Sequence, residues 1–200
     1  NESPVITLFI YYVLPRSFTT FCFQYLCNKV NYVVRKSLEN AVQMEYKALT
    51  DDMTGAYNKN RLIELLNNRE RDGQDIAVIY WDVNQLKYVN DNWGHLCGDR
   101  LITEVAKTIQ SIAREEDIVI RYGGDEFLLY VANGTKEIAE QLIKTWKVRL
   151  EEEKKRENYE FPVSASVGYA LGKHSQLKDI IAAADKDMYA NKRICRESAK

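Results

Sequence analysis

The sequence predicts an α+β domain with a ferredoxin-like (split βαβ), palm-type antiparallel sheet, flanked by helices and preceded by an N-terminal stalk helix. Three observations lead to this prediction. Beyond Asp51, the apolar patterns follow the order strand, helix, two strands, helix, strand. Two adjacent glycines between short β-prone runs indicate a hairpin. A long helical stripe of apolar residues precedes this region. We therefore expect an N-terminal segment over residues 1–49 and a globular domain over residues 50–200.

The N-terminal segment is poor in charge. Val5–Leu14 is apolar throughout and is followed by Pro15, but it is shorter than the roughly twenty residues that span a bilayer. It is therefore either the end of a membrane-spanning helix or an ordinary packed helix. Phe18–Leu49 is predicted as one long helix, because apolar residues recur every three or four positions. These positions are Cys27, Val30, Val34, Leu38 and Ala41. Such a stripe packs against its own domain or a partner helix, which is typical of a linker or stalk.

The hairpin is the best-defined element of the predicted domain. Its strands are Asp117–Tyr122 and Glu126–Val131, and Gly123-Gly124 are expected to supply the positive φ angles of a two-residue turn. The other predicted elements are helices at Arg61–Asn68, Gly98–Arg114, Lys136–Lys155 and Leu177–Lys192 and strands at Asp75–Trp81 and Phe161–Leu171.

Composition excludes several classes of function. With 28 Lys and Arg against 29 Asp and Glu, the chain has no basic excess to bind a nucleic-acid polymer. Its four cysteines form no Cys-x-x-Cys pair and it has two histidines, which argues against a zinc site and for reduced thiols in a cytoplasmic domain. Because the sequence begins at Asn1 without a methionine, we expect a fragment. An upstream sensor, a targeting signal or an inner-membrane anchor would lie before it.

Two carboxylates mark a candidate metal site. The predicted strand Asp75–Trp81 is followed by Asp82, and the hairpin turn is followed by Asp125. If the strands are neighbours, these side chains converge, and hard cations such as Mg²⁺ prefer such oxygen ligands. The alternative is that Asp82 caps its strand and Asp125 completes the turn. Spacing alone leaves both interpretations open.

Six motifs in order resemble the GGDEF family, the diguanylate cyclases. The resemblance covers Leu49 to Arg196. The motifs are Asp51–Asn58, Asp82–Asp91, Gly94–Asp99, Gly123–Glu126, Ser166–Gly168 and Ala184–Lys192. The chain departs from the family pattern at Asn84, where many members carry an acid, at Gln85-Leu86, where two aromatic residues are common, and at Ala56-Tyr57 in the opening motif. Since the implied metal ligands lie outside these departures, we expect little loss of function.

The resemblance implies roles for the residues around the hairpin. Asp82, the backbone carbonyl of Val83 and Asp125 resemble the ligands of Mg²⁺, with Mn²⁺ as an alternative. Glu126 matches a position required for activity, as a metal ligand or a proton acceptor. Lys87, with the loop amides beside it, would cradle the phosphates and offset charge that develops in the transition state.

The resemblance also implies how GTP is held. Asn90 and Asp99 match the pair that reads guanine, and His95 belongs to the same substrate-binding motif. A carboxylate accepts from the N1–H and N2 amine of guanine, donors that adenine lacks, so Asp99 favours GTP over ATP. The alternative for Asp99 is a cap of a helix that starts near Leu101. Lys192 and Arg196, which are four residues apart and so neighbours if the last helix persists, would bind the β- and γ-phosphates; otherwise they are a solvated helix end.

The implied reaction condenses two GTP into cyclic di-GMP and two pyrophosphates. Because one domain would bind one GTP, the resemblance implies a homodimer, which the stalk helix could assemble. Arg114 and Asp117 stand at the family's spacing for an inhibitory product site, where Arg would pair with guanine or phosphate. Without that spacing, four such residues at a helix end would indicate little. The rival hypothesis is a non-catalytic receptor that binds GTP or cyclic di-GMP.

Overall fold

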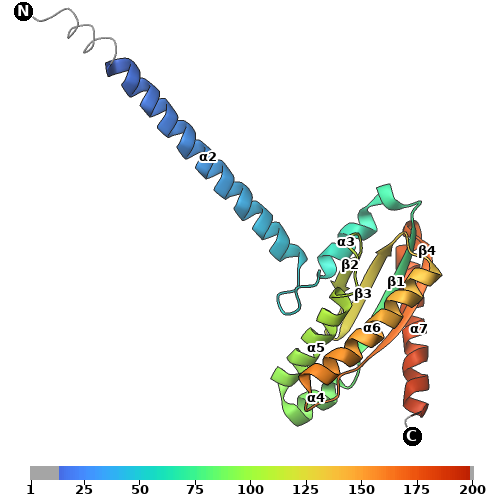
Figure 1. Ribbon diagram of the computed structural model, residues 1–200. Helices are drawn as coiled ribbons and strands as arrows, with labels where there is room; N and C mark the ends of the chain where they lie inside the picture. Colours follow the sequence, from blue (N-terminus) through green and yellow to red (C-terminus); the bar gives the residue numbers. More distant parts are fainter. Residues whose placement is uncertain (1–13, 199–200) are drawn as a thin grey trace, which may run out of the picture. The chain divides into compact units, whose positions relative to one another are not determined.

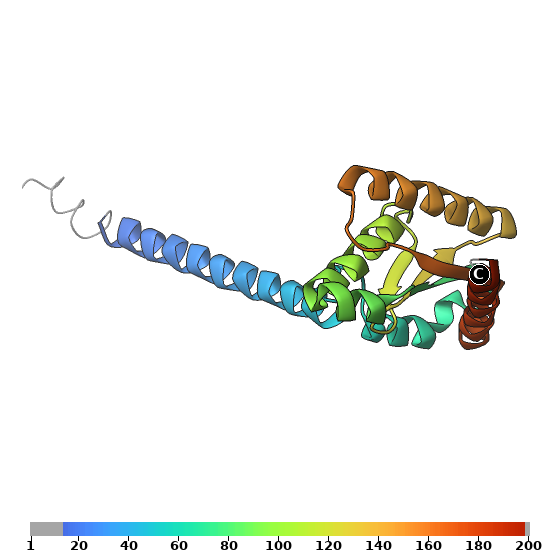
Figure 2. The ribbon, with the colours of Figure 1, turned by 90° about the horizontal axis from the view of Figure 1, so that it is seen from below.

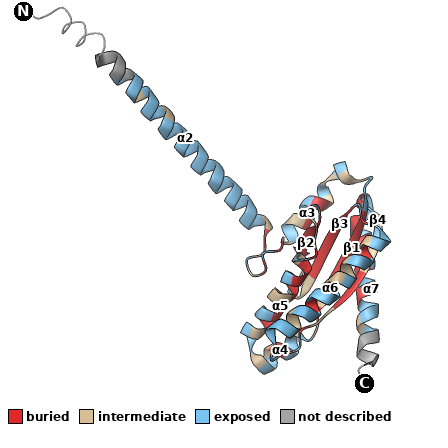
Figure 3. Cartoon of the chain, in the orientation of Figure 1, coloured by how far each residue is buried: buried red, intermediate tan, exposed pale blue. Residues whose placement is uncertain are grey.

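A computed structural model describes residues 14–198, without the side chains of residues 14–17, 19 and 194–198. The chain divides into two units, Asn1–Tyr46 and Lys47–Lys200. Most of the first is part of the long helix α2 (Leu14–Leu49), which confirms the predicted stalk helix (Figure 1). Its apolar side chains are exposed, with Leu38 at 62%, rather than packed within the unit (Figure 3). Apart from Leu14, the apolar segment Val5–Leu14 lies outside the described residues. None of the described helices combines the length and apolar character needed to cross a bilayer.

The second unit is built on a four-stranded antiparallel sheet. Its strands are β1 (Asp75–Val83), β2 (Ile118–Arg121), β3 (Glu126–Ala132) and β4 (Ala165–Lys173). They lie in the order β2-β3-β1-β4, so the chain's first strand is central and its last forms an edge. This order confirms the predicted ferredoxin-like sheet.

Helices cover both faces of the sheet (Figure 2). Ala77, Ile79 and Trp81 of β1 face one core, with α5 (His95–Gln110) and α6 (Lys136–Glu157). Ile76, Val78 and Tyr80 face a second core, with α3 (Lys59–Asn67) and α7 (Leu177–Ser198). The alternation follows from the period of two in a strand. It places Asp82, the next residue on the Tyr80 side, toward the face covered by α7.

One helix was missed, and two elements begin at other residues than predicted. Helix α4 (Leu86–Trp93) occupies what was expected to be a loop; it has eight residues and one buried side chain, Val89, so its apolar period is weak. Helix α5 begins at His95 rather than Gly98, because Gly94, with φ of 83°, turns the chain sharply between α4 and α5. Strand β4 begins at Ala165 rather than Phe161, and the intervening Pro162 has no N–H for a ladder. Short 3₁₀ turns at Arg69–Arg71 (η2) and His174–Gln176 (η3) complete the unit.

Candidate active site

Two acidic side chains meet where β1 ends. The ladder pairs Asp82 of β1 with Glu126 of β3 on one side and with Ser166 of β4 on the other. Directly paired residues on neighbouring strands have Cβ atoms about 5 Å apart. Val83 then donates its N–H to the Asp125 carbonyl at 2.9 Å, which ties the hairpin loop to the end of β1. The structure therefore brings together Asp82, Glu126 and the backbone at Asp125.

Helix α7 brings a cation to this pair. Lys192 Nζ lies 2.5 Å from Asp82 Oδ1, and both side chains are 18% exposed. Their partial burial makes the ion pair stronger than one at the surface. Because α7 continues to Ser198, beyond its predicted end at Lys192, position 196 follows one helical turn later. Arg196 falls within this helix, and its side chain lies outside what the structure describes.

The glycine turn differs from its prediction. Neither Gly123 nor Gly124 has a positive φ angle. The Tyr122 N–H donates to the Glu126 carbonyl at 2.8 Å, so three residues rather than two form the loop. A side chain at Gly123 would strike the Glu126 carboxylate, which folds back over it. Position 123 is therefore a glycine because the Glu126 side chain occupies the space that a Cβ atom would need.

Arg121 clamps this turn to the start of the domain. Its guanidinium donates to the Gly124 carbonyl at 2.7 Å and to both carboxylate oxygens of Asp51 at 3.0 Å. Asp51 also accepts the N–H and hydroxyl of Thr54. Burial alone would raise the pKa of Asp51, but the bonds from Thr54 and Arg121 outweigh it and lower the pKa below 3.8. The opening motif is thus bonded to the residue that holds the turn.

Tyr80 is a site residue that sequence reasoning missed. It lies two residues before Asp82 on the same face of β1, diagonal to Glu126, and is 2% exposed. Burial raises its pKa above 10, and a hydrogen bond with the Glu126 carboxylate and the nearby charge of Asp185 add to the effect. A tyrosine two residues before Asp82, and so on the same face of a buried strand, was the available signal.

The β1–α4 connection offers donors for an anion. Gln85 adopts the left-handed conformation, with φ of 59°, and α4 starts at Leu86 without a side-chain cap. The first amides of such a helix are suited to bind phosphate. Lys87, one residue further, is exposed.

The predicted guanine-reading pair lies at the α4–α5 corner. The Asn90 side chain lies against Gly98, where a larger residue would collide with it, and Asp99 follows immediately. Asp99 and His95 are exposed. Since α5 begins at His95, the alternative in which Asp99 caps a helix near Leu101 is wrong. Asn90 and Asp99 are therefore positioned by packing of α4 on α5.

Arg114 and Asp117 bind each other in this structure. Arg114 donates to both carboxylate oxygens of Asp117, at 2.9 and 2.8 Å, and to the Ala132 carbonyl at 2.9 Å. The Asp117 side chain has no exposed surface, whereas that of Arg114 is 33% exposed. The bonds to Asp117 raise the pKa of Arg114. Arg114 is accessible to a ligand, and the buried Asp117 carboxylate fixes the position of its guanidinium.

The end of β1 carries oxygen donors of the kind that divalent cations prefer. In the described part of the chain, no three His, Cys, Asp or Glu side chains are grouped to enclose a metal. Mg²⁺ in nucleotide enzymes is bound through one or two carboxylates together with substrate phosphates. Asp82, Glu126 and the Val83 carbonyl supply oxygen donors of this kind.

Comparison with known proteins agrees with this geometry. Residues 48–198 match the family model described as "Diguanylate cyclase, GGDEF domain". The probable diguanylate cyclase DgcJ of Escherichia coli is 33% identical over an alignment of 167 residues, and the match covers 78% of this chain and 33% of DgcJ. The cyclic di-GMP phosphodiesterase PdeR of Escherichia coli is 34% identical over an alignment of 149 residues, and the match covers 72% of this chain and 22% of PdeR. The chain therefore spans a third or less of the length of these two relatives.

Solved structures share the fold. The coiled coil and GGDEF domain of DgcB from Caulobacter crescentus, in complex with c-di-GMP, has a TM-score of 0.71 and 25% identity, and the match covers 86% of this chain and 94% of that one. The GGDEF domain of DgcB alone, also with c-di-GMP, has a TM-score of 0.65 and 28% identity, covering 73% and 91%.

Proposed function

Because the chain belongs to the GGDEF family of diguanylate cyclases, we propose that it condenses two GTP into cyclic di-(3′→5′)-GMP with loss of two pyrophosphates. The observation that carries the proposal is the pairing of Asp82 with Glu126 beside Lys192 at the end of β1. Each 3′-oxygen attacks the α-phosphorus of the other nucleotide, and pyrophosphate leaves.

We propose Mg²⁺ as the metal, held by Asp82, the Val83 carbonyl and Asp125, with Mn²⁺ as an alternative. When bound, it would stabilise negative charge on the reacting phosphate. Glu126 would hold the metal or accept the proton of the 3′-hydroxyl. Lys192 is bonded to Asp82 in this structure and would exchange that carboxylate for the phosphates of GTP.

The substrate would lie along α4. The first amides of this helix and Lys87 would bind the phosphates, with Arg196 supporting Lys192, and Asn90 and Asp99 would read guanine at the α4–α5 corner. His95 would border the same corner. Exposure of Asp99 and the contact of Asn90 with Gly98 support this placement.

We propose that two copies form a homodimer, because the reaction joins two nucleotides. The exposed apolar stripe of α2 supports pairing of two stalk helices, since burial of such a stripe favours association. Activity that rises with the square of protein concentration at high dilution would agree. A fragment from Lys47 onward with equal specific activity at every dilution would argue against a role for the stalk.

Product inhibition is proposed at Arg114. The exposed part of its guanidinium could bind a guanine edge or phosphate of cyclic di-GMP, and Asp117 would take guanine donors once the pair opens. Calorimetric titration of cyclic di-GMP should show loss of binding in Arg114→Ala. Glu116→Ala, which removes a weaker 3.3 Å contact to Arg114, should retain it. Full binding by a folded Arg114→Ala would refute the assignment.

Incubation of the purified chain with GTP and Mg²⁺, with products resolved by mass spectrometry, tests the proposed reaction. Cyclic di-GMP from wild type, its absence in Glu126→Gln and insensitivity to excess ATP are expected. The rival function, a receptor for GTP or cyclic di-GMP, is supported by similarity to a protein named as a phosphodiesterase. Nucleotide binding without product, even with dimerisation enforced by a fused coiled coil, would favour it.

A further inference from the structure

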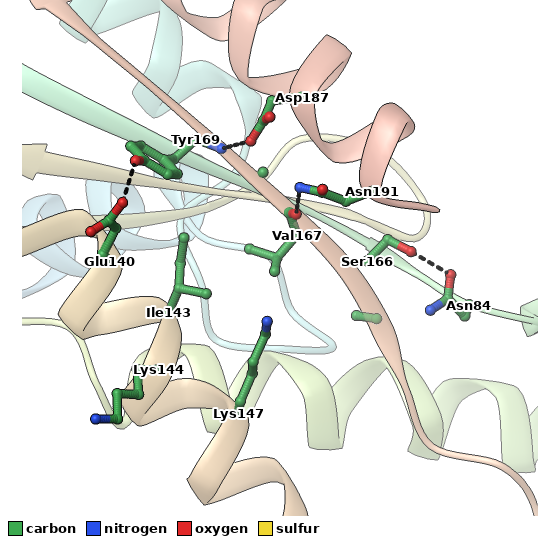
Figure 4. A pocket seen from close by; sticks show the side chains of 12 residues that line it. Asn84, Glu140, Ile143, Lys144, Lys147, Ser166, Val167, Tyr169, Asp187 and Asn191 are labelled. Carbon is green, nitrogen blue, oxygen red and sulfur yellow. Dashed lines mark hydrogen bonds between the residues drawn. The ribbon is translucent and has the colours of Figure 1, made fainter. Parts of the chain in front are cut away.

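A cavity of about 490 Å³ lies along the outer edge of β4, between α6 and α7 (Figure 4). Its apolar wall includes Ile143 and Val167, and its polar wall includes Asn84, Lys147 and Asn191. A volume of this size is in the range of small-molecule sites, which combine apolar walls with a few polar groups.

The edge of β4 inside the cavity is closed to another strand. Asn191 donates its side-chain N–H to the Val167 carbonyl at 3.1 Å, and Asp187 accepts the Tyr169 N–H at 3.0 Å. These side chains of α7 take positions that an added strand would need. The cavity therefore suits a small molecule rather than an extended peptide.

The acidic groups of the cavity are engaged, whereas donors remain available. Glu140 accepts the Tyr169 hydroxyl at 2.9 Å, and Asp187 accepts the Tyr169 N–H. The Asn84 side-chain oxygen accepts the Ser166 hydroxyl at 2.9 Å, which leaves its NH₂ group for a ligand. The Lys147 amine points into the cavity (Figure 4) and has no carboxylate partner among the described residues. Free donors and a free cation match an acceptor-rich anion.

We propose that this cavity binds a small organic anion, with its carboxylate or phosphate at Lys147 and Asn84 and its apolar body against Ile143 and Val167. The site is separate from the proposed GTP site but adjoins it. Asn84 lies two residues after Asp82, and Asn191 directly precedes Lys192. An occupant can therefore shift the residues of the Asp82–Lys192 pair and alter turnover. The effect on turnover rests on the proposed cyclase function, whereas binding itself does not.

Binding can be tested without any assay of activity. Phenyl phosphate carries both the anionic group and the apolar part of the proposed ligand. Inorganic phosphate carries only the anionic group, and phenol carries only the apolar part. Titration calorimetry should show saturable binding of phenyl phosphate that is at least about tenfold tighter than that of either partial probe. The titration is repeated with saturating 3′-deoxy-GTP, which cannot react through a 3′-hydroxyl. Retained binding is expected, and displacement by 3′-deoxy-GTP would overturn the separate site.

Two lysines one turn apart on α6 provide a matched pair of variants. Lys147→Met keeps an unbranched side chain that is shorter by one atom and removes its charge, so phenyl phosphate should bind about tenfold more weakly. Lys144 also lines the cavity, but its amine points away from it (Figure 4), so Lys144→Met should keep affinity within about twofold. Equal losses in both variants would indicate diffuse surface charge and overturn the proposal. So would the absence of saturable binding by the wild type.

Discussion

Tyr80→Phe is the sharpest test of the geometry around Glu126. The substitution keeps the buried ring and removes only the hydroxyl, whose pKa is raised by burial and by its interaction with the Glu126 carboxylate. Hydrogen bonds to charged groups contribute about 1.5–3 kcal/mol, but Glu126 is partly exposed and can regain water, so we expect a net loss of about 1 kcal/mol of unfolding free energy. In a domain of this size, that lowers the unfolding midpoint by about 2–4 °C.

The effect on activity should exceed the effect on stability. A Glu126 carboxylate that is no longer oriented should lower kcat about tenfold, equivalent to about 1.4 kcal/mol of transition-state stabilisation. The Mg²⁺ dependence of the rate separates the two roles of Glu126. If Glu126 is a metal ligand, more Mg²⁺ is needed for half-maximal rate and saturation restores kcat. If it accepts a proton, kcat stays low at saturating Mg²⁺.

Tyr130→Phe is the matched control. Tyr130 lies on the same face of the sheet, and its buried hydroxyl is 3.0 Å from His174 Nδ1, remote from Glu126. It should lose similar stability and keep wild-type kcat. Equal kcat in Tyr80→Phe and wild type, or equal losses in the two variants, would refute the assignment of Tyr80 as a positioning residue.

Three further substitutions test the scaffold. Asp51→Asn should cost about 2 kcal/mol at pH 7 in denaturant titrations. Since the folded pKa of Asp51 lies below 3.8, its contribution is present above that pH and is lost as the pH falls through the folded pKa, so the difference should vanish in acid; a constant difference would contradict this. Gly168→Ala places a methyl group against the backbone of α7 and should cost about 3 kcal/mol, whereas Gly73→Ala, in open space, should be nearly neutral. Arg114→Ala strands the buried Asp117 carboxylate and should cost about 3 kcal/mol by thermal unfolding; an unchanged midpoint would contradict it.

The elements that sequence reasoning placed correctly carry strong local patterns. The buried run of β1 and the apolar faces of α5 and α7 repeat with the period of their own structure, and their existence was predicted. Helix α4 was missed because Val89 is its only fully buried side chain. The turn at Gly123 was misjudged because the reason for its glycine is a side chain that folds back from β3, a contact that two-residue turn rules do not include.

The residues of the candidate site were named from the sequence, but their contacts with one another were not. The resemblance to a family named Asp82, Glu126 and Lys192, and strand register and helix packing then placed the three together. The register of β1 against β3 also places Tyr80 diagonal to Glu126. No sequence motif predicts this register. The burial of Asp117 under Arg114 likewise depends on Ala132 of a neighbouring strand. Long-range pairing, rather than local propensity, accounts for what remained unpredicted.

The clamp formed by Arg121 has a practical consequence for protein engineering. The same guanidinium holds the Gly124 carbonyl and Asp51, and Asn58 and Asn60 donate to the Ala48 carbonyl in the last turn of α2. The N-terminal boundary of the domain therefore lies near Lys47, upstream of its first motif. A chimera that replaces the N-terminal part with another input module should be joined before Lys47. A junction after Asp51 would separate the glycine turn from its anchor, and the hybrid would fail for reasons unrelated to the grafted module.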